Sequence, residues 1–180
     1  MNPGSAGFLL DTNYISELVR VEPDARAFAW IDREEESTLF LSVITLAGIR
    51  KGFDELASGT RRTELDTWLT VELPLRFVGR ILPVEPAIAD RWGVLAARGK
   101  RNGTPLPWAD GFLAATAPHR NLVRVTRNTK DFVPFGVPIL NHRFQSADRH
   151  ARRFGLREYD LPRSDPYCRP TFPFSLDLED

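Results

Sequence analysis

The sequence has very little cysteine and no long apolar run. Cys168 is the only cysteine among 180 residues. This excludes an internal disulfide framework and a cysteine-rich zinc site, and it is typical of the reducing cytoplasm. No run of about 18 apolar residues appears, and the N-terminus lacks a basic segment followed by an apolar one. We therefore expect a soluble cytoplasmic protein that is neither secreted nor bound to a membrane.

An excess of charge of one sign is absent as well. The 24 Lys and Arg residues balance the 24 Asp and Glu residues, so any basic surface for nucleic acid must be local. The three histidines lack metal-ligand spacing, and no glycine-rich phosphate loop is present. These absences argue against a zinc site, histidine-based catalysis and a nucleotide-binding α/β domain.

Short apolar runs alternate with amphipathic stretches over the first 144 residues. A composition of 42% hydrophobic and 27% charged residues suits one domain with a single core. The apolar runs predict strands at 7–10, 39–43, 77–84, 122–126 and 137–140. The amphipathic stretches predict helices at 13–20, from 23 to about 31, from 45 towards 58, and at 61–72, 86–98 and 108–117, with a loop at 99–103. This alternation predicts an α/β fold of three layers, with a central parallel sheet covered on both faces.

The character of the sequence changes after about Phe144. Arginines cluster between 149 and 157, and four prolines follow between 162 and 173. We expect a domain over residues 1–144 and an irregular extension over residues 145–180, which wraps around the domain or stays partly disordered.

Three separate segments carry a carboxylate where a predicted strand ends or a predicted helix begins. They contain Asp11, Asp110 and Asp131. Sites in open α/β sheets form beyond the carboxyl ends of the strands, so we expect these segments to converge. Clustered acids raise one another's pKa, and a divalent cation relieves that repulsion. Mg²⁺ suits such a site because it prefers oxygen ligands and polarises phosphate.

With these segments in place, the chain resembles the PIN-domain ribonucleases, specifically the VapC- and FitB-like toxins of type II toxin–antitoxin pairs. The motifs that carry the resemblance are LLDTN at 9–13 with ISE at 15–17, LSVIT at 41–45, GRILP at 79–83, ADGFLAATA at 109–117, and TRN at 126–128 with DF at 131–132. Each motif alone is weak, but their order and spacing together are specific. The resemblance implies a PIN-like fold and an endoribonuclease that cleaves RNA with Mg²⁺, for which Mn²⁺ substitutes. It also implies a homodimer or a higher toxin–antitoxin assembly, and inhibition by a cognate antitoxin.

The resemblance also assigns positions. Asp11 matches the first metal-binding acid and Asp110 the third, while Asn128 and Asp131 both lie where the fourth acidic position falls. The hydroxyl-bearing and amide neighbours of these acids are Thr12, Asn13 and Thr126. Plainer explanations stay open: Asp11 as a helix cap, Asp110 as a first-turn acid, and residues 128 and 131 as turn or loop residues.

One departure from the family concerns its second acid. The family pattern resembles Thr-Leu-Ala-Glu-Ile-Arg-Lys-Gly, whereas residues 45–52 read TLAGIRKG and put Gly48 at the acidic position. A glycine inside a helix is about 1 kcal/mol less favourable than alanine. We consider an introduced or selected inactivating change, which we favour, a naturally weakened homologue, and compensation by another acid such as Glu17. We expect weak metal binding and poor RNA cleavage, with activity in a Gly48→Glu variant; the alternative is a non-catalytic module that binds antitoxin or RNA.

Apolar residues on the predicted helices bear on where a partner protein would bind. The stretch with Tyr14, Ile15, Leu18 and Trp30, together with the helix around Ile49, is expected to form either a groove for an antitoxin helix or ordinary core. The four tryptophans are expected in the core or at dimer contacts rather than as platforms for base stacking.

Overall fold

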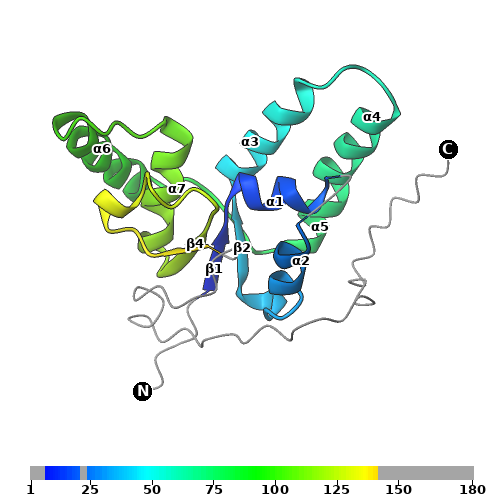
Figure 1. Ribbon diagram of the computed structural model, residues 1–180, viewed down its shortest axis with the longest axis horizontal. Helices are drawn as coiled ribbons and strands as arrows, with labels where there is room; N and C mark the ends of the chain where they lie inside the picture. Colours follow the sequence, from blue (N-terminus) through cyan, green and yellow to red (C-terminus); the bar gives the residue numbers. More distant parts are fainter. Residues whose placement is uncertain (1–6, 21–23, 142–180) are drawn as a thin grey trace.

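The computed structural model describes residues 7–20 and 24–141 (Figure 1). The predicted extension over residues 145–180, with its arginine cluster, lies outside the described residues. No helix in the described part is long and apolar enough to cross a membrane.

Five parallel strands form the central sheet in the order β3-β2-β1-β4-β5. They are β1 (Gly7–Leu10), β2 (Leu39–Ser42), β3 (Ile81–Leu82), β4 (Leu122–Val125) and β5 (Ile139–Leu140). All residues of β1 and β4 are buried, as expected for central strands of a sheet that is covered on both faces. Leu10 pairs with Val125, so β1 and β4 end side by side.

Helices cover both faces of this sheet, which confirms the predicted three layers. Figure 1 shows α6 and α7 on one side of β1 and the remaining helices on the other. The helices are α1 (Thr12–Leu18), α2 (Ala25–Ile31), α3 (Val43–Asp54), α4 (Thr60–Thr67), α5 (Leu73–Arg76), α6 (Pro86–Arg101) and α7 (Trp108–His119).

Successive residues of each strand point to opposite faces of the sheet and so divide the core in two. Phe8 and Leu10 pack into the cluster formed with α1, α2 and α3. Leu9 and Leu122 pack into the cluster beneath α7. The same alternation places Arg124, two residues after Leu122, on the α7 face.

The predicted strand over 77–84 is wrong for most of its length. A π-helical stretch (Trp68–Glu72) joins α4 to α5, and Phe77 ends this helical run, with its N–H donating to the carbonyl of Leu73 at 3.1 Å. Phe77 is apolar because it packs into the core at the end of a helix, not because it belongs to a strand. Gly79 then adopts a left-handed conformation with φ of 72° before β3 begins.

Two other predicted boundaries also differ. Ser42, not Thr45, caps α3, since its hydroxyl accepts from the N–H of Ile44 at 3.2 Å. Helix α6 continues to Arg101, through part of the predicted loop at 99–103. Gly99 serves close packing there, because a Cβ atom on it would lie 2.8 Å from the carbonyl oxygen of Thr104.

Candidate functional site

Asp11 and Asp110 meet at the carboxyl ends of β1 and β4, as the sequence predicts. Asp11 directly follows β1, and its N–H donates to the carbonyl of Val125 at 3.1 Å. Asp110 lies in the first turn of α7. The Asp11 carboxylate makes no capping hydrogen bond to α1, so its side chain serves another purpose. Segments about a hundred residues apart in sequence therefore form one acidic pair.

A buried arginine joins the two acids. Nη2 of Arg124 lies 2.9 Å from Oδ2 of Asp11 and 2.7 Å from Oδ1 of Asp110. The side chain of Arg124 is 0% exposed, that of Asp11 4% and that of Asp110 30%. One guanidinium thus neutralises part of the charge of two carboxylates.

Sequence reasoning missed Arg124, although a signal was present. Strand β4 reads LVRV, and a charged side chain in a strand buried on both faces must find a partner. Arg124 makes two further contacts besides those with the two carboxylates. Its Nη1 donates to the backbone carbonyl of Asp110 at 3.2 Å, and its Cζ lies 3.9 Å from the ring centroid of Phe132. Among the described residues its Nε has no hydrogen-bond partner.

Helix α3 brings position 48 to the same place. The hydroxyl of Thr45 donates to the carbonyl of Leu10 at 3.2 Å and ties the first turn of α3 to the end of β1. A Cβ atom on Gly48 would lie 2.7 Å from Oγ1 and 3.0 Å from Cγ2 of Thr12. Gly48 therefore faces the residue next to Asp11, and any larger side chain at 48 requires the Thr12 side chain to move.

The candidates for the fourth acidic position form a turn of their own. The N–H of Asn128 donates to Oγ1 of the buried Thr126 at 3.1 Å, and the Asn128 amide donates to the exposed Asp131 carboxylate. The contacts found in the described residues link neither Asn128 nor Asp131 to Asp11 or Asp110. Their role as ligands stays a prediction, as does that of the exposed Asn13.

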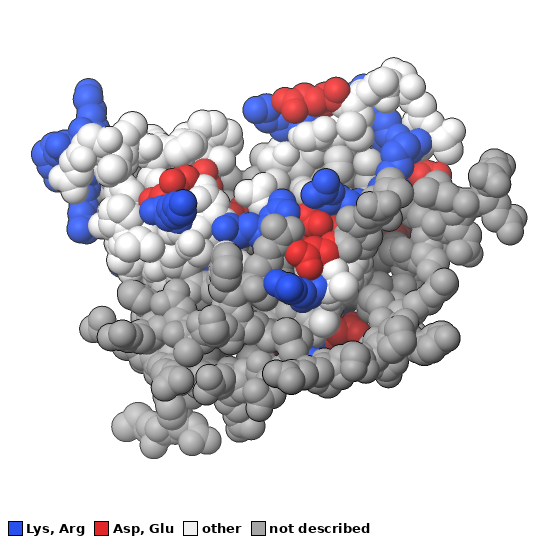
Figure 2. Space-filling view, in the orientation of Figure 1, with Lys and Arg blue, Asp and Glu red and all other residues white. Residues whose placement is uncertain are grey.

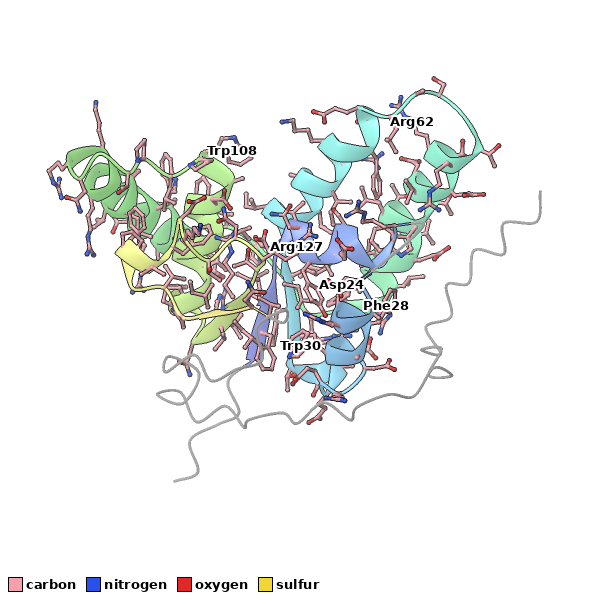
Figure 3. All side chains as sticks on the ribbon, viewed as in Figure 1. Asp24, Phe28, Trp30, Arg62, Trp108 and Arg127 are labelled. Atoms are coloured by element: carbon pink, nitrogen blue, oxygen red, sulfur yellow. The ribbon has the colours of Figure 1, made fainter. Side chains whose placement is uncertain are left out.

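Glu17, the acid considered as a replacement for the missing carboxylate, is engaged elsewhere. Its carboxylate accepts from Arg127 at 2.6 Å, from Arg20 at 3.2 Å and from the N–H of Asp24 at 3.1 Å. Burial raises the pKa of Glu17, but the Asp24 N–H and the two arginines outweigh it and hold the pKa below its ordinary value. Arg127 lies between the two helical layers (Figure 3). The geometry gives the compensation hypothesis no support.

The residues present do not fit a bound magnesium ion as they stand. Within the described ranges, no three His, Cys, Asp or Glu side chains gather in a way that could hold a metal. Oδ2 of Asp11 and Oδ1 of Asp110 already accept from Nη2 of Arg124, and the positive charge of Arg124 repels a second cation. On the face shown in Figure 2, basic side chains lie beside acidic ones rather than in one continuous basic patch.

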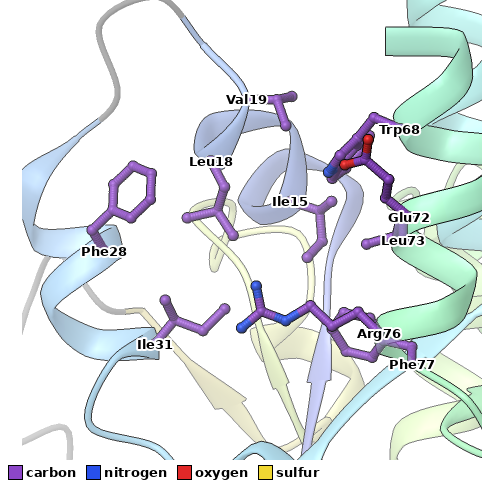
Figure 4. Close-up of a pocket in the computed structure, with 10 residues that line it drawn as sticks. All are labelled: Ile15, Leu18, Val19, Phe28, Ile31, Trp68, Glu72, Leu73, Arg76 and Phe77. Carbon is purple, nitrogen blue, oxygen red and sulfur yellow. The ribbon is translucent and has the colours of Figure 1, made fainter. Parts of the chain in front are cut away.

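An apolar pocket lies on the other side of the sheet, between α1, α2 and the segment from α4 to α5 (Figure 4). Its lining residues are Ile15, Leu18, Val19, Phe28, Ile31, Trp68, Glu72, Leu73, Arg76 and Phe77. Both predicted alternatives are present. Ile15 and Leu18 line the pocket, and Ile15 also belongs to the core together with Tyr14, Trp30 and Ile49. Use of the pocket by an antitoxin helix stays a prediction.

The tryptophans follow the predicted pattern in part. Trp30 and Trp68 are buried in the core. Trp92 stacks on Phe112 with 4.9 Å between the ring centroids. Trp108 is 59% exposed at the start of α7, two residues before Asp110.

Comparison with known proteins agrees with this geometry. Residues 8–133 match the PIN domain family. The chain is 39% identical over 133 residues to the VapC ribonuclease Y4jK of Sinorhizobium fredii, an alignment that covers 74% of this chain and 95% of that protein. It is 36% identical over 133 residues to the toxin FitB of Neisseria gonorrhoeae, which covers 74% of this chain and 96% of that protein.

Solved structures show the same likeness. The FitAcB crystal structure from Neisseria gonorrhoeae has a TM-score of 0.71 and 35% identity, and the match covers 76% of this chain and 99% of that one. The structure of FitAB bound to a DNA fragment has a TM-score of 0.70 and 34% identity, with 75% and 94% coverage.

Proposed function

The chain belongs to the PIN-domain family of VapC- and FitB-like toxins, and on that premise we propose that it is the toxin-type member of a toxin–antitoxin pair with a weakened ribonuclease centre. The observation that carries the proposal is the position of Gly48. It faces Thr12 beside Asp11, where the family pattern has a carboxylate, and no other acid in the described part of the chain joins the pair to form a metal-holding group. RNA is the proposed substrate class because a relative is a VapC ribonuclease.

The magnesium ion belongs to a form of the site that has the missing acid. Asp11 and Asp110 would hold the ion, with Mn²⁺ as a substitute, once a carboxylate stands at position 48. In the present chain Arg124 instead binds one oxygen of each acid.

A cognate antitoxin is the proposed protein partner. A relative is named toxin FitB, and FitAB has been solved on DNA. The pocket between α1, α2 and the α4–α5 segment suits one apolar face of a helix, and Glu72 and Arg76 at its lining offer polar contacts. A homodimer or a larger toxin–antitoxin assembly, and a cytoplasmic location, are part of the same proposal.

Cleavage of several RNA substrates with Mg²⁺ or Mn²⁺ tests the enzymatic part. We expect little cleavage by the native chain, at least about tenfold more by Gly48→Glu, and loss of the gain when Asp11→Asn is added, since one carboxylate ligand is then gone. Equal activity of the native chain and Gly48→Glu would contradict a centre weakened by Gly48.

A second candidate function is a PIN-fold module that binds antitoxin or RNA without cutting it. The observation that favours it is Arg124, which engages both acids. Absence of cleavage by every variant, with binding retained, would favour this module over the nuclease.

A further inference from the structure

Three charged side chains meet beneath α7 with little access to solvent. Arg124 is fully buried, Asp11 nearly so, and Asp110 reaches the surface in part. We propose that the Arg124 guanidinium is the resident cation of this acid pair and keeps divalent metal ions out of the native chain. This inference rests on the proposed function, because that function assigns Asp11 and Asp110 to the acidic site of the fold.

The direction of Arg124 follows from the strand that carries it. Leu122 and Arg124 lie on the face that Leu9 also uses, and Val123 and Val125 lie on the opposite face. The side chain therefore enters the layer between the sheet and α7, where it is fully buried. Asp11, at the end of the neighbouring strand, and Asp110, in the first turn of α7, supply the negative charge that such burial requires.

The guanidinium is held on several sides. Phe132 packs against its face with 3.9 Å between Cζ and the ring centroid. The carbonyl of Asp110 accepts from Nη1 at 3.2 Å, while Nη2 serves the two carboxylates. A metal ion shared by the two acids would compete with Arg124 for their carboxylates and would be repelled by its positive charge.

Loss of one acid distinguishes an arginine-filled site from an empty metal site. In the native chain, Asp110→Asn removes one of the two carboxylates of Arg124, so we expect a lower melting temperature. In an Arg124→Met background the two acids face each other without a cation, so we expect the same Asp110→Asn change to raise the melting temperature. The reversal of sign requires Arg124 to be the cation between the acids.

Metal binding gives a second readout that involves no RNA. Calorimetric titration of MnCl₂ into the native chain should show no binding at the acid pair. Titration into Gly48→Glu/Arg124→Met should show Mn²⁺ bound at least about tenfold more tightly than by Gly48→Glu alone, with a matching rise in melting temperature. Adding Asp11→Asn should abolish both effects.

Arg127→Met is the matched control, since Arg127 also pairs with a buried carboxylate, that of Glu17. We expect no Mn²⁺ site in this variant, because within residues 7–20 and 24–141 Glu17 belongs to no group of acids that could hold a metal. Should Arg124→Met fail to fold, two measurements on chains that keep Arg124 still test the inference. Mn²⁺ binding to it that disappears in Asp11→Asn, or a rise in melting temperature on Asp110→Asn, would overturn the inference. None of these measurements depends on RNA cleavage, so their failure is separable from failure of the proposed function.

Discussion

In the described part of the protein, two buried carboxylates lie next to arginines, and the two arrangements differ. The side chains of Glu17 and Asp11 are 3% and 4% exposed. Glu17 has three donors of its own, and its arginines, Arg20 and Arg127, are 61% and 27% exposed. Asp11 shares one fully buried guanidinium with a second acid.

This difference separates a structural tie from a candidate site. The contacts of Glu17 join α1 to the residue before α2 and to the segment after β4, and its charge is balanced by groups that stay hydrated. The Asp11 cluster places two acids around one buried guanidinium at the strand ends. Both acids therefore depend on a single cation, whereas Glu17 does not depend on either of its arginines alone.

Removal of the buried guanidinium should have the largest effect. Arg124→Met leaves Asp11 buried without a counter-charge, so we expect the free energy of unfolding to fall by about 3 to 5 kcal/mol. Urea denaturation followed by circular dichroism measures it. A loss below about 1 kcal/mol, the range of exposed ion pairs, would show that Arg124 is not the main partner of Asp11.

Removal of an arginine from Glu17 should lower the free energy of unfolding by less. In Arg127→Met, Glu17 keeps Arg20 and the Asp24 N–H, and we expect a loss of about 1 to 2 kcal/mol for one charge-assisted hydrogen bond. The same urea titration compares it with Arg124→Met. If Arg127→Met proves the more damaging, the contrast between a shared buried cation and a solvated one is wrong.

The sequence predicts the central strands and the acid pair for physical reasons that are easy to state. β1, β2 and β4 are predictable because each is a mostly apolar run that ends in polar residues, and these residues begin a helix after β1 and β2. Asp11 and Asp110 are predictable because residues that follow strands or begin helices gather at one edge of a parallel sheet.

Arg124 escapes such reasoning because its partners are not local. Asp110 lies 14 residues away and Asp11 113 residues away in sequence, so no spacing rule joins them. The apolar neighbours of Arg124 predict the strand correctly and draw attention away from the charge within it. The predicted strand from Phe77 fails for a related reason, since a single apolar residue fits the end of a buried helix as well as a strand.

The pH dependence of unfolding measures how much the contacts of Glu17 add to stability. The pKa of Glu17 lies below its ordinary value of 4.5. A carboxyl with a lower pKa in the folded chain stabilises the fold above the unfolded pKa, and this contribution disappears as pH falls through the folded pKa. We therefore expect the native chain to lose stability below about pH 4.5, and Glu17→Gln to lose less over that interval.

Glu36→Gln provides the control for that experiment. Burial raises the pKa of Glu36, but Arg76 and Arg80 hold it below its ordinary value overall. Its side chain is 52% exposed, so solvent screens the pairing. Melting temperatures from pH 3 to pH 7, roughly the range over which carboxyls titrate, should change less in Glu36→Gln than in Glu17→Gln. The opposite order would mean that the Glu17 contacts add little to stability.

The smallest effect concerns Gly48, next to the acid pair, and Gly52, one turn later in α3. Alanine is about 1 kcal/mol more favourable than glycine inside a helix, and a Cβ atom on Gly52 meets nothing within 4 Å. Gly52→Ala should therefore raise the free energy of unfolding by most of that amount. Gly48→Ala should raise the free energy of unfolding by less, because its Cβ atom would lie 2.7 Å from Oγ1 of Thr12. Adding Thr12→Ser, which removes the methyl group and frees the hydroxyl to rotate, should recover part of the difference in urea denaturation. Equal gains at both glycines would show that Thr12 leaves room at position 48, and that a glutamate there meets no steric barrier beside Asp11.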